Sequence, residues 1–367
     1  MIDVNNLFKF LSRNGVSFFS GVPDSILKNT KWLLEKKNKK QHITTANEGS
    51  AIASSIGYFL ATGKLPCAYM QNSGLGNAIN PLVAVAHKKV YAIPILLLIG
   101  WRGAPGLKDE PQHQAKGSIT TKLLRLLDIK YCVLNKKNDF IKLKQLIKFS
   151  KKNNKPVACL IKKNILSNSK KHFYFIKKIS DFTREDLIKA LLNKIKAKTK
   201  LISTTGFTSR ELYQLRIKHK LKNGRDFYMV GGMGHSSMVA LGTSLHTKKD
   251  VICLDGDGSL IMHMGSLANI GFSAGKNFKH ILLNNFSHES VGGQRTNSDN
   301  LDFKRLVEGA GYKKFFLIKN KKNINKILKQ FLNCKGPCFL EARIKQGAPK
   351  ELTRPKNLIE VKKAFIK

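Results

Sequence analysis

Two polar residues in the second half of the chain could share a metal ion. Asp257 stands between Gly256 and Gly258, directly after a short apolar run, and Asn285 follows the next apolar run along the chain. A carboxylate oxygen and an amide oxygen suit Mg²⁺ or Ca²⁺ that is shared with phosphate oxygens. The two glycines would let the backbone approach a phosphate closely. We therefore expect a site for a metal ion and a phosphate group here.

The elements that must position these residues form one βαβ unit. The apolar runs at 251–254 and 280–283 have the composition of buried parallel strands, with a tight turn after the first and a helical pattern over 260–272. The segment from Asp257 to Asn285 is long enough for the crossover that parallel strands need. Open α/β sheets bind ligands at the carboxyl ends of their strands, where both residues would lie.

The Gly-Asp-Gly and Asn-Asn arrangement resembles the signature of enzymes that depend on thiamine diphosphate. This resemblance implies that Asp257, Asn285 and the backbone carbonyl of Ser287 hold the Mg²⁺ bound to the cofactor diphosphate. An ordinary acidic turn with an Asn-rich loop is the alternative, but the spacing and the flanking strands favour the cofactor site. A dinucleotide fingerprint is disfavoured, because Ile79 and Ile261 stand where its third glycine belongs.

The first half of the chain alternates strand and helix patterns, which predicts a doubly wound α/β domain. Glu48 lies at the carboxyl end of its second expected strand, 43–46, where a helix rich in Ala, Ser and Gly begins. An isolated glutamate there would simply be favoured by the helix dipole. The resemblance instead implies that Glu48 hydrogen-bonds the aminopyrimidine ring of the cofactor.

Further motifs extend the resemblance from Gly21 to about Gln294. They are GVPDS at 21–25, ANEGSA at 46–51, QNSGLGNAINPL at 71–82, IGWRG at 99–103, DEPQH at 109–113 and NNFSHESVGGQ at 284–294. Together they resemble the phosphonopyruvate decarboxylases, which are thiamine diphosphate-dependent carboxy-lyases acting on a 2-oxo acid. The implied reaction turns 3-phosphonopyruvate into phosphonoacetaldehyde and CO₂ in phosphonate biosynthesis. The related sulfopyruvate decarboxylases, or another enzyme acting on an anionic 2-oxo acid, are the alternative.

The same resemblance assigns roles to individual residues. Glu48, Asp24 and His113 would be catalytic, the last two as proton relays, with His288 and Glu289 as weaker candidates. The residues implied to contact the cofactor are Glu48, Thr205, Gly206, Gly231, Met233, Gly234, His235, Gly256, Asp257, Gly258, Ser259 and Asn285. Among them, the Gly231 carbonyl would accept a hydrogen bond from the amino group of the cofactor. Met233 would be the apolar wedge that forces the cofactor into its bent form.

The substrate anion needs polar and cationic partners. We expect these to be Ser25, Gln71, Arg102 and Arg295, because arginine binds oxyanions in a bidentate manner. Arg295 is a departure, since the family pattern has proline after Gly-Gly-Gln. This difference bears on substrate preference.

Two domains of the thiamine diphosphate-binding type, each a doubly wound parallel sheet, are expected. Residues 1–165 would form the pyrimidine-binding domain, 166–182 a linker and 183–367 the diphosphate-binding domain, with no room for a middle domain. In the resembled family the cofactor lies between the first domain of one subunit and the second domain of another. The resemblance therefore implies a homo-oligomer. The lysine-rich tail from Gly347 is expected to be a surface segment.

The composition is strongly basic, with 66 Lys and Arg against 23 Asp and Glu. A basic nucleic-acid-binding protein with an inactive enzyme fold is therefore an alternative. However, the lysines are scattered among Asn and Ile without interleaved aromatic residues, so we expect no nucleic-acid partner. The positive field would instead attract an anionic substrate. The longest apolar run, 93–99, is too short to span a bilayer, and the amino terminus lacks a signal-peptide pattern, so we expect a cytoplasmic protein without a membrane partner.

Overall fold

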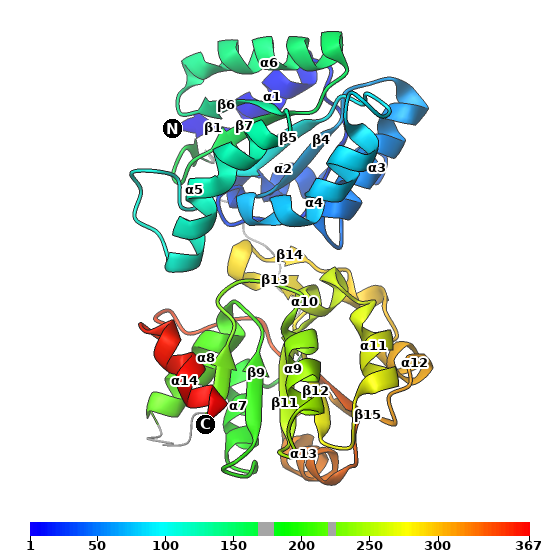
Figure 1. The fold of residues 1–367 in the computed structure, drawn as a ribbon, viewed down its shortest axis with the longest axis vertical. Helices are drawn as coiled ribbons and strands as arrows, with labels where there is room; N and C mark the ends of the chain where they lie inside the picture. The colour runs from blue at the N-terminus through cyan, green and yellow to red at the C-terminus, as the bar shows by residue number, and fades with distance from the viewer. Residues whose placement is uncertain (168–179, 219–224) are drawn as a thin grey trace. The chain divides into compact units, whose positions relative to one another are not determined.

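The computed structural model describes residues 1–167, 180–218 and 225–367 (Figure 1). The chain forms two compact units, unit 1 (Met1–Tyr174) and unit 2 (Phe175–Lys367). Most of the linker expected at 166–182 lies outside the described residues, so the domain limits stay predictions. Within the described chain, no middle domain separates the two units.

Unit 1 is built on a six-stranded sheet in which every pair is parallel, in the order β3-β2-β4-β5-β7-β6. Its strands are β2 (Phe19–Gly21), β3 (His42–Thr44), β4 (Cys67–Gln71), β5 (Leu96–Gly100), β6 (Lys130–Leu134) and β7 (Val157–Ile161). Its helices are α1 (Val4–Arg13), α2 (Lys31–Glu35), α3 (Glu48–Thr62), α4 (Leu75–Pro81), α5 (Pro111–Leu126) and α6 (Phe140–Asn153). A short parallel pair joins β1 (Ile2–Asp3) to β8 (Leu166–Ser167).

The central strand β5 shows why the sheet needs helices on both faces. Leu96 and Leu98 belong to a core cluster that includes residues of α1 and α6, whereas Leu97 and Ile99 belong to a second cluster with residues of α3, α4 and α5. Successive strand residues point to opposite faces. A continuous apolar strand is therefore buried on both sides, which confirms the doubly wound prediction.

Unit 2 repeats this design with a six-stranded parallel sheet of order β10-β9-β11-β12-β16-β15. Its strands are β9 (Lys200–Ser203), β10 (Asp226–Tyr228), β11 (Val251–Gly256), β12 (Phe278–Asn284), β15 (Lys314–Ile318) and β16 (Cys338–Arg343). Its helices are α7 (Arg184–Leu192), α8 (Phe207–Lys218), α9 (Ser236–Leu245), α10 (Asp257–Met262), α11 (Ser266–Ser273), α12 (Phe303–Gly309), α13 (Ile324–Asn333) and α14 (Leu358–Ile366). A small antiparallel pair joins β13 (Ser287–His288) to β14 (Gln294–Arg295).

Two elements of unit 2 differ from the expectation. The single helix expected over 260–272 is two helices, because the backbone leaves the helical region at His263, where φ is −134° and ψ is 50°. The expected turn is also shorter, since β11 runs to Gly256 and α10 begins at once with Asp257. The tail, expected to be a surface segment, ends in α14, which has no buried residue, and its Phe365 ring lies 5.6 Å from that of Phe227.

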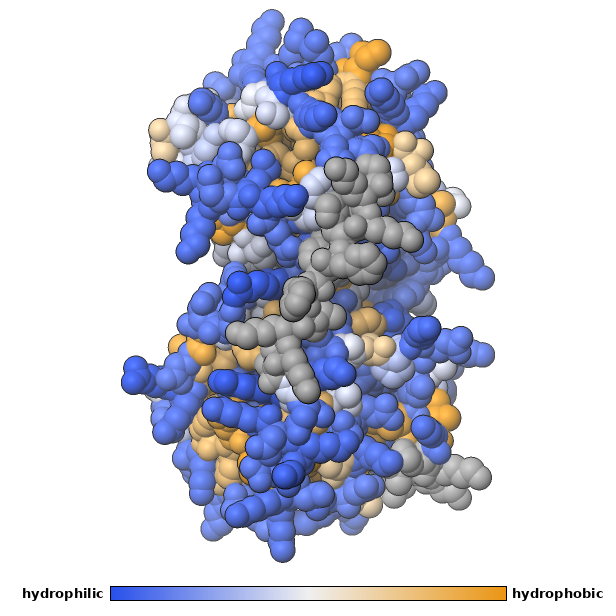
Figure 2. All heavy atoms as spheres, turned by 180° about the vertical axis from the view of Figure 1, so that it is seen from behind, coloured by the Kyte–Doolittle hydropathy of each residue, from blue (hydrophilic) through white to orange (hydrophobic). Residues whose placement is uncertain are grey.

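The surface reflects the lysine content of the sequence. Figure 2 shows that hydrophilic residues dominate the visible face of each unit, with apolar residues scattered among them. Among the residues that the structure describes, no helix combines the length and the apolar character needed to cross a membrane.

Candidate active site

Glu48 is clamped at the carboxyl edge of the unit 1 sheet. It is the first residue of α3, and the Asn47 side chain caps this helix by accepting a hydrogen bond from the Ser50 amide at 2.9 Å. The carboxylate is 5% exposed, and the Asn77 side-chain amide donates to its Oε2 at 2.7 Å. A Cβ atom at Gly74 would lie 2.2 Å from Oε1. Neighbours therefore fix both oxygens of this carboxylate.

Asp24 lies in the segment that follows β2, and β2 is the neighbour of β3, the strand that precedes Glu48. It is 1% exposed, and the Gln71 side-chain amide donates to its Oδ1 at 2.7 Å. The amides of Ile26 and Leu27 both donate to Oδ2 at 3.1 Å. Burial raises the pKa of Asp24 above its usual value, although these hydrogen bonds oppose the rise. The structure thus brings together Asp24 and Gln71, two of the residues predicted for the site.

Arg102 follows β5 and is already paired. Its Nε and Nη2 donate to the two carboxylate oxygens of Asp109 at 2.7 and 2.5 Å, and its Nη1 donates to Ser25 Oγ at 3.2 Å. Burial raises the pKa of Asp109, but hydrogen bonds from Arg102 and Gly103 outweigh it and lower that pKa to about 2. The predicted substrate residues Arg102 and Ser25 therefore meet, with a carboxylate balancing the guanidinium charge.

His113 is the third residue of a helix. Helix α5 begins at Pro111, a residue suited to the first helical position because it lacks an N–H to be satisfied. His113 Nε2 lies 3.8 Å from Glu110 Oε2. A Cβ atom at Gly103, where φ is +63°, would lie 1.9 Å from the His113 carbonyl oxygen. The preceding loop is thus packed directly against the first turn of α5.

The carboxyl ends of β9, β10 and β11 carry most of the predicted cofactor residues of unit 2. The Gly234 amide donates to Ser259 Oγ at 3.1 Å, and Thr204 Oγ1 donates to the same oxygen at 2.9 Å. Gly234 has a φ of +89°, which glycine adopts without strain. The predicted Gly234 and Ser259 are therefore in contact.

The other predicted cofactor residues line the same edge in a less buried setting. Thr205 and Gly206 follow β9, while Gly231 and Met233, both half-buried, follow β10. The exposed His235 ring stacks on the ring of His263 with centroids 4.4 Å apart.

Asp257 is a buried carboxylate held by hydroxyl groups. It is 3% exposed, and Thr296 Oγ1 and Ser298 Oγ donate to its Oδ2 at 2.5 and 2.9 Å. Burial raises the pKa of Asp257 to about 6, although both hydrogen bonds lower it. Ser298 Oγ also lies 3.0 Å from Asn284 Oδ1, which links the end of β11 to the end of β12.

Asn285 is oriented by the loop that follows it. Its side-chain amide donates to Glu289 Oε2 at 3.0 Å, while its Oδ1 accepts the Ser287 amide at 3.1 Å. Gln346, beyond β16, donates to the Asn285 carbonyl at 2.9 Å. Glu289, a weaker candidate for a proton relay, is therefore occupied in fixing Asn285. It is also paired with Arg184 at 2.8 Å.

The pair of Arg184 and Glu289 belongs to a buried group of three charges. Arg184 Nη1 also donates to Glu211 Oε1 at 2.5 Å, and both of these side chains are buried. Burial raises the pKa of Glu211 to about 7, although the Arg184 charge opposes the rise. One arginine thus serves two glutamates beside the Asn285 loop.

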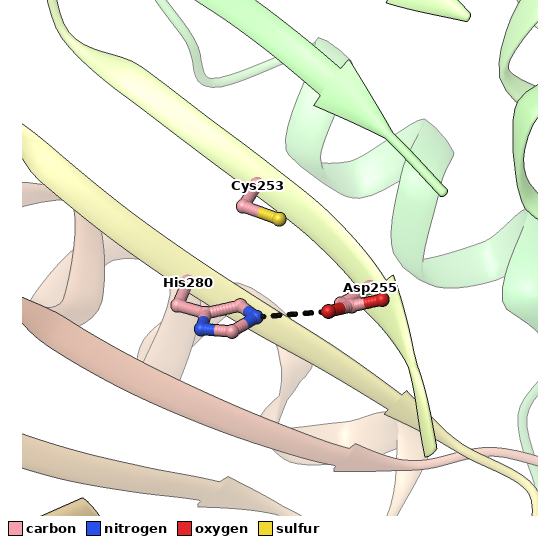
Figure 3. Close-up of side chains that lie close together, drawn as sticks. All are labelled: Cys253, Asp255 and His280. Carbon is pink, nitrogen blue, oxygen red and sulfur yellow. Dashed lines mark ion pairs between the residues drawn. The ribbon is translucent and has the colours of Figure 1, made fainter. Parts of the chain in front are cut away.

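A second buried cluster supports the turn from β11 into α10 (Figure 3). His280 Nε2 lies 3.4 Å from Asp255 Oδ2, and His280 Nδ1 lies 3.0 Å from the Tyr312 hydroxyl. Asp255 Oδ1 accepts the Gly256 amide at 2.9 Å. Cys253 is the register partner of His280. The cluster therefore holds the residue that precedes Asp257.

The last predicted residues lie on the β13–β14 pair, where Ser287 stands opposite Arg295. The Arg295 side chain is 70% exposed and forms an ion pair with Asp299. His288 packs against the Gly-Asp-Gly segment at 256–258, since a Cβ atom at Gly258 would lie 2.6 Å from the His288 Cε1 atom. Burial lowers the pKa of His288 to about 4, which keeps its ring neutral.

The donor chemistry of the unit 2 edge fits a divalent cation. The Asp257 carboxylate and the Asn285 amide oxygen are hard ligands of the kind Mg²⁺ takes. Asp257 is buried, yet among the described residues no cationic side chain forms an ion pair with it. An unpaired buried carboxylate is costly, and a bound cation would offset that cost.

Several contacts escaped the sequence analysis. Asn77, which donates to Glu48, lies inside the quoted motif at 71–82. Its closeness in sequence to Gly74 was the signal that could have placed it near Glu48. Thr296 and Ser298 are remote from Asp257 in sequence, and only the folded loop brings them to it. The pairing of Asp109 with Arg102 likewise depends on how the intervening loop folds.

Comparisons with known proteins cover nearly the whole chain. A family model described as the N-terminal TPP binding domain of thiamine pyrophosphate enzymes matches residues 4–123. The corresponding C-terminal TPP binding domain matches residues 205–342.

Curated relatives align over similar lengths. A phosphonopyruvate decarboxylase of Streptomyces hygroscopicus is 33% identical over 374 residues, covering 97% of this chain and 91% of the relative. One from Streptomyces viridochromogenes is 33% identical over 377 residues, covering 97% and 92%. A sulfopyruvate decarboxylase of Methanosarcina acetivorans is 25% identical over 390 residues, covering 97% of each chain.

Proposed function

The chain belongs to the thiamine pyrophosphate enzymes, and from this we propose that it decarboxylates 3-phosphonopyruvate to phosphonoacetaldehyde and CO₂ without oxidation. The observation that carries the proposal is the match to phosphonopyruvate decarboxylases over 97% of the chain. Such a reaction would place the protein in phosphonate biosynthesis.

We assign the metal and the cofactor to the residues whose surroundings suit them. Asp257, Asn285 and the Ser287 carbonyl would hold Mg²⁺. The hydroxyl groups of Thr296 and Ser298, which donate to Asp257, can rotate to make room for the ion. Gly256 and Gly258 would let the backbone approach the diphosphate of thiamine diphosphate. When bound, the cofactor supplies an electron sink for the electron pair that CO₂ leaves behind.

The carboxyl groups of unit 1 would handle protons. Glu48, with Oε2 held by Asn77, would present its carboxylate to the aminopyrimidine ring in a fixed orientation. Asp24 has a raised pKa, which favours the protonated form that can donate a proton. His113, at the start of α5, would be the second relay.

Substrate binding is assigned to the polar groups around the Arg102 loop. The Arg102 guanidinium is aimed by Asp109 and reaches Ser25, so it would meet the substrate anion with little loss of side-chain entropy. Gln71 lies beside Asp24 at the end of β4. Arg295, exposed at the metal loop, would be the second cation.

We further propose that the active site needs two copies of the chain, with Glu48 from one and Asp257 from another. Exposed apolar side chains, among them Leu60 and Tyr91 in unit 1 and Phe272 in unit 2, support burial against a partner. The test is complementation by mixed subunits. Co-expressed Glu48→Gln and Asp257→Asn chains should regain activity that neither variant has alone, because a mixed dimer contains one intact site. A mixture as inactive as its components would contradict a shared site.

The activity is tested by aldehyde release from phosphonopyruvate and from sulfopyruvate, with Mg²⁺ and thiamine diphosphate added or omitted. Turnover that needs both additions and favours phosphonopyruvate is the expected result. A preference for sulfopyruvate would instead support the second candidate, which the full-length similarity to a sulfopyruvate decarboxylase keeps in view. No turnover of either substrate by the folded protein would overturn the proposal.

A further inference from the structure

Two thiols meet at the edge of the unit 2 sheet opposite to the candidate site. Cys334 directly follows α13, and Cys338 is the first residue of β16. Their sulfur atoms lie 2.8 Å apart. Cys338 begins β16, which runs parallel to β12, so the cysteine pair lies where the strands of this sheet begin. Asp257 and Asn285 lie where β11 and β12 end.

The segment between the two cysteines is fixed by the backbone on both sides. The Gly336 amide donates to the Lys276 carbonyl at 2.8 Å, and the Lys313 amide donates to the Pro337 carbonyl at 2.8 Å. A Cβ atom at Gly336 would lie 2.1 Å from the Phe278 carbonyl oxygen. The approach of the sulfurs is therefore built into the packing, and bonding them would cost little further conformational entropy.

The two thiols differ in access and share a cationic setting. Cys334 is half-buried, whereas Cys338 is 0% exposed. Lys279 Nζ donates to the Cys334 carbonyl at 2.6 Å. Burial and the neighbouring thiol raise the pKa of Cys338 to about 12, and the charges of Lys279 and Lys314 oppose this rise. A partly exposed thiol in a cationic setting is the kind that reacts first.

We propose that Cys334 and Cys338 are a site of reversible oxidation, at which a low-molecular-weight disulfide converts the two thiols into one intramolecular disulfide. With oxidised glutathione, the Cys334 thiolate attacks one glutathione sulfur, forms a mixed disulfide and releases a glutathione thiolate. Cys338 then loses its proton to that thiolate, and its sulfur attacks the Cys334 sulfur, releasing the second glutathione. The two protein thiols together lose two electrons and two protons, which one oxidised glutathione takes up.

The other four cysteines give internal references. Cys67, Cys159 and Cys253 are buried, and Cys132 is half-buried opposite Cys159 in the pairing of β6 with β7. The β6–β7 pair also combines a half-buried thiol with a buried one. It is therefore the competing site that an experiment must separate from Cys334 and Cys338.

The test incubates the full chain in mixtures of reduced and oxidised glutathione, alkylates the remaining thiols and maps peptides by mass spectrometry. The peptide with Cys334 and Cys338 should lose two hydrogens and escape alkylation until a reductant is added. The Cys338→Ser variant should instead keep one glutathione on Cys334, and Cys334→Ser should leave Cys338 unmodified. The matched control Cys67→Ser should behave as the wild type.

Three results would overturn this proposal. They are a disulfide only between Cys132 and Cys159, a stable glutathione adduct on wild-type Cys334, and equal protection of Cys338 when Cys334 is serine. Circular dichroism of each variant separates these outcomes from misfolding. The oxidised wild type should also unfold at a higher urea concentration than its reduced form, with no such shift in either serine variant. Equal midpoints for both forms would count against a link that ties α13 to β16.

Discussion

The carboxyl edges of the two sheets each present a buried carboxylate, but different donors hold it. In unit 1 the Asn77 amide donates to Glu48, and in unit 2 the hydroxyls of Thr296 and Ser298 donate to Asp257. A side-chain amide nitrogen can only donate, whereas a hydroxyl oxygen can also accept or bind a cation. The unit 1 edge therefore aims a carboxylate at a hydrogen-bonding partner, and the unit 2 edge can rearrange around a metal ion.

The arginines of the two edges show the same contrast. Arg102 is matched by one carboxylate, that of Asp109, whereas Arg184 is shared between Glu211 and Glu289. Burial raises the pKa of Glu211 to about 7, so near neutral pH this glutamate can bind a proton beside Arg184. In the proposed reaction, unit 1 would supply proton transfer and unit 2 would supply metal binding.

The largest effect is expected from Glu48→Gln. Glutamine keeps the size of the side chain and removes its charge, so kcat/KM should fall about 1,000-fold, within the range for groups that act on protons. Circular dichroism and unfolding in urea check the fold. Asn77→Ala, which removes only the aiming amide, should cost clearly less. Activity of Glu48→Gln within about tenfold of the wild type would break the distinction between the two edges.

Gly74→Ala tests whether unit 1 depends on position and not only on charge. The new Cβ would lie 2.2 Å from Glu48 Oε1, so the carboxylate must move by about 1 Å, and such a displacement can cost about 100-fold in activity. Gly76→Ala is the matched control, because no atom lies within 4 Å of its added Cβ. Steady-state kinetics of both variants make the comparison. Equal activities would mean that the aim of Glu48 is unimportant.

Much of this architecture could be predicted from sequence, because the strands of both sheets are short apolar runs followed by polar residues. The strands expected at 251–254 and 280–283 lie within β11 and β12, since apolar residues mark them. Helix 260–272 was wrong, because its pattern continues across His263, where the backbone nevertheless breaks. The capping residue Asn357 gave a signal for α14 that the lysine-rich composition obscured.

The site was less predictable than the fold. The motifs placed Glu48, Asp257 and Asn285 at strand ends, but they said nothing about their partners. Thr296 and Ser298 reach Asp257 through a loop whose path depends on tertiary packing. Side chains far apart in sequence lack a periodic signal, so their contacts appear only in the folded chain.

Asp257→Asn should weaken Mg²⁺ binding at the proposed metal site of unit 2 by about 10- to 100-fold. Asparagine keeps the shape and removes the charge that Mg²⁺ needs. The measurement is calorimetric titration of Mg²⁺ in the presence of thiamine diphosphate. Ser298→Ala removes one hydroxyl group that donates a hydrogen bond to the Asp257 carboxylate, and it should have the smaller effect. Unchanged Mg²⁺ affinity in Asp257→Asn would remove the metal-binding side of the comparison.

Glu211→Gln should change stability with pH and leave the chemistry nearly unaltered. The folded state raises the Glu211 pKa from 4.5 to about 7, so it binds this proton more tightly than the unfolded chain does. The wild type therefore loses about 3 kcal/mol relative to the variant as pH rises from about 4.5 to 7. Urea unfolding at pH 4.5, 6 and 8 measures the difference. For Asp109→Asn in unit 1 the difference from wild type should stay flat from pH 5 to 8, because Asp109 with a pKa of about 2 is ionised throughout. A flat response in Glu211→Gln as well would mean that Arg184 keeps Glu211 ionised, and the two edges would then not differ in their response to pH.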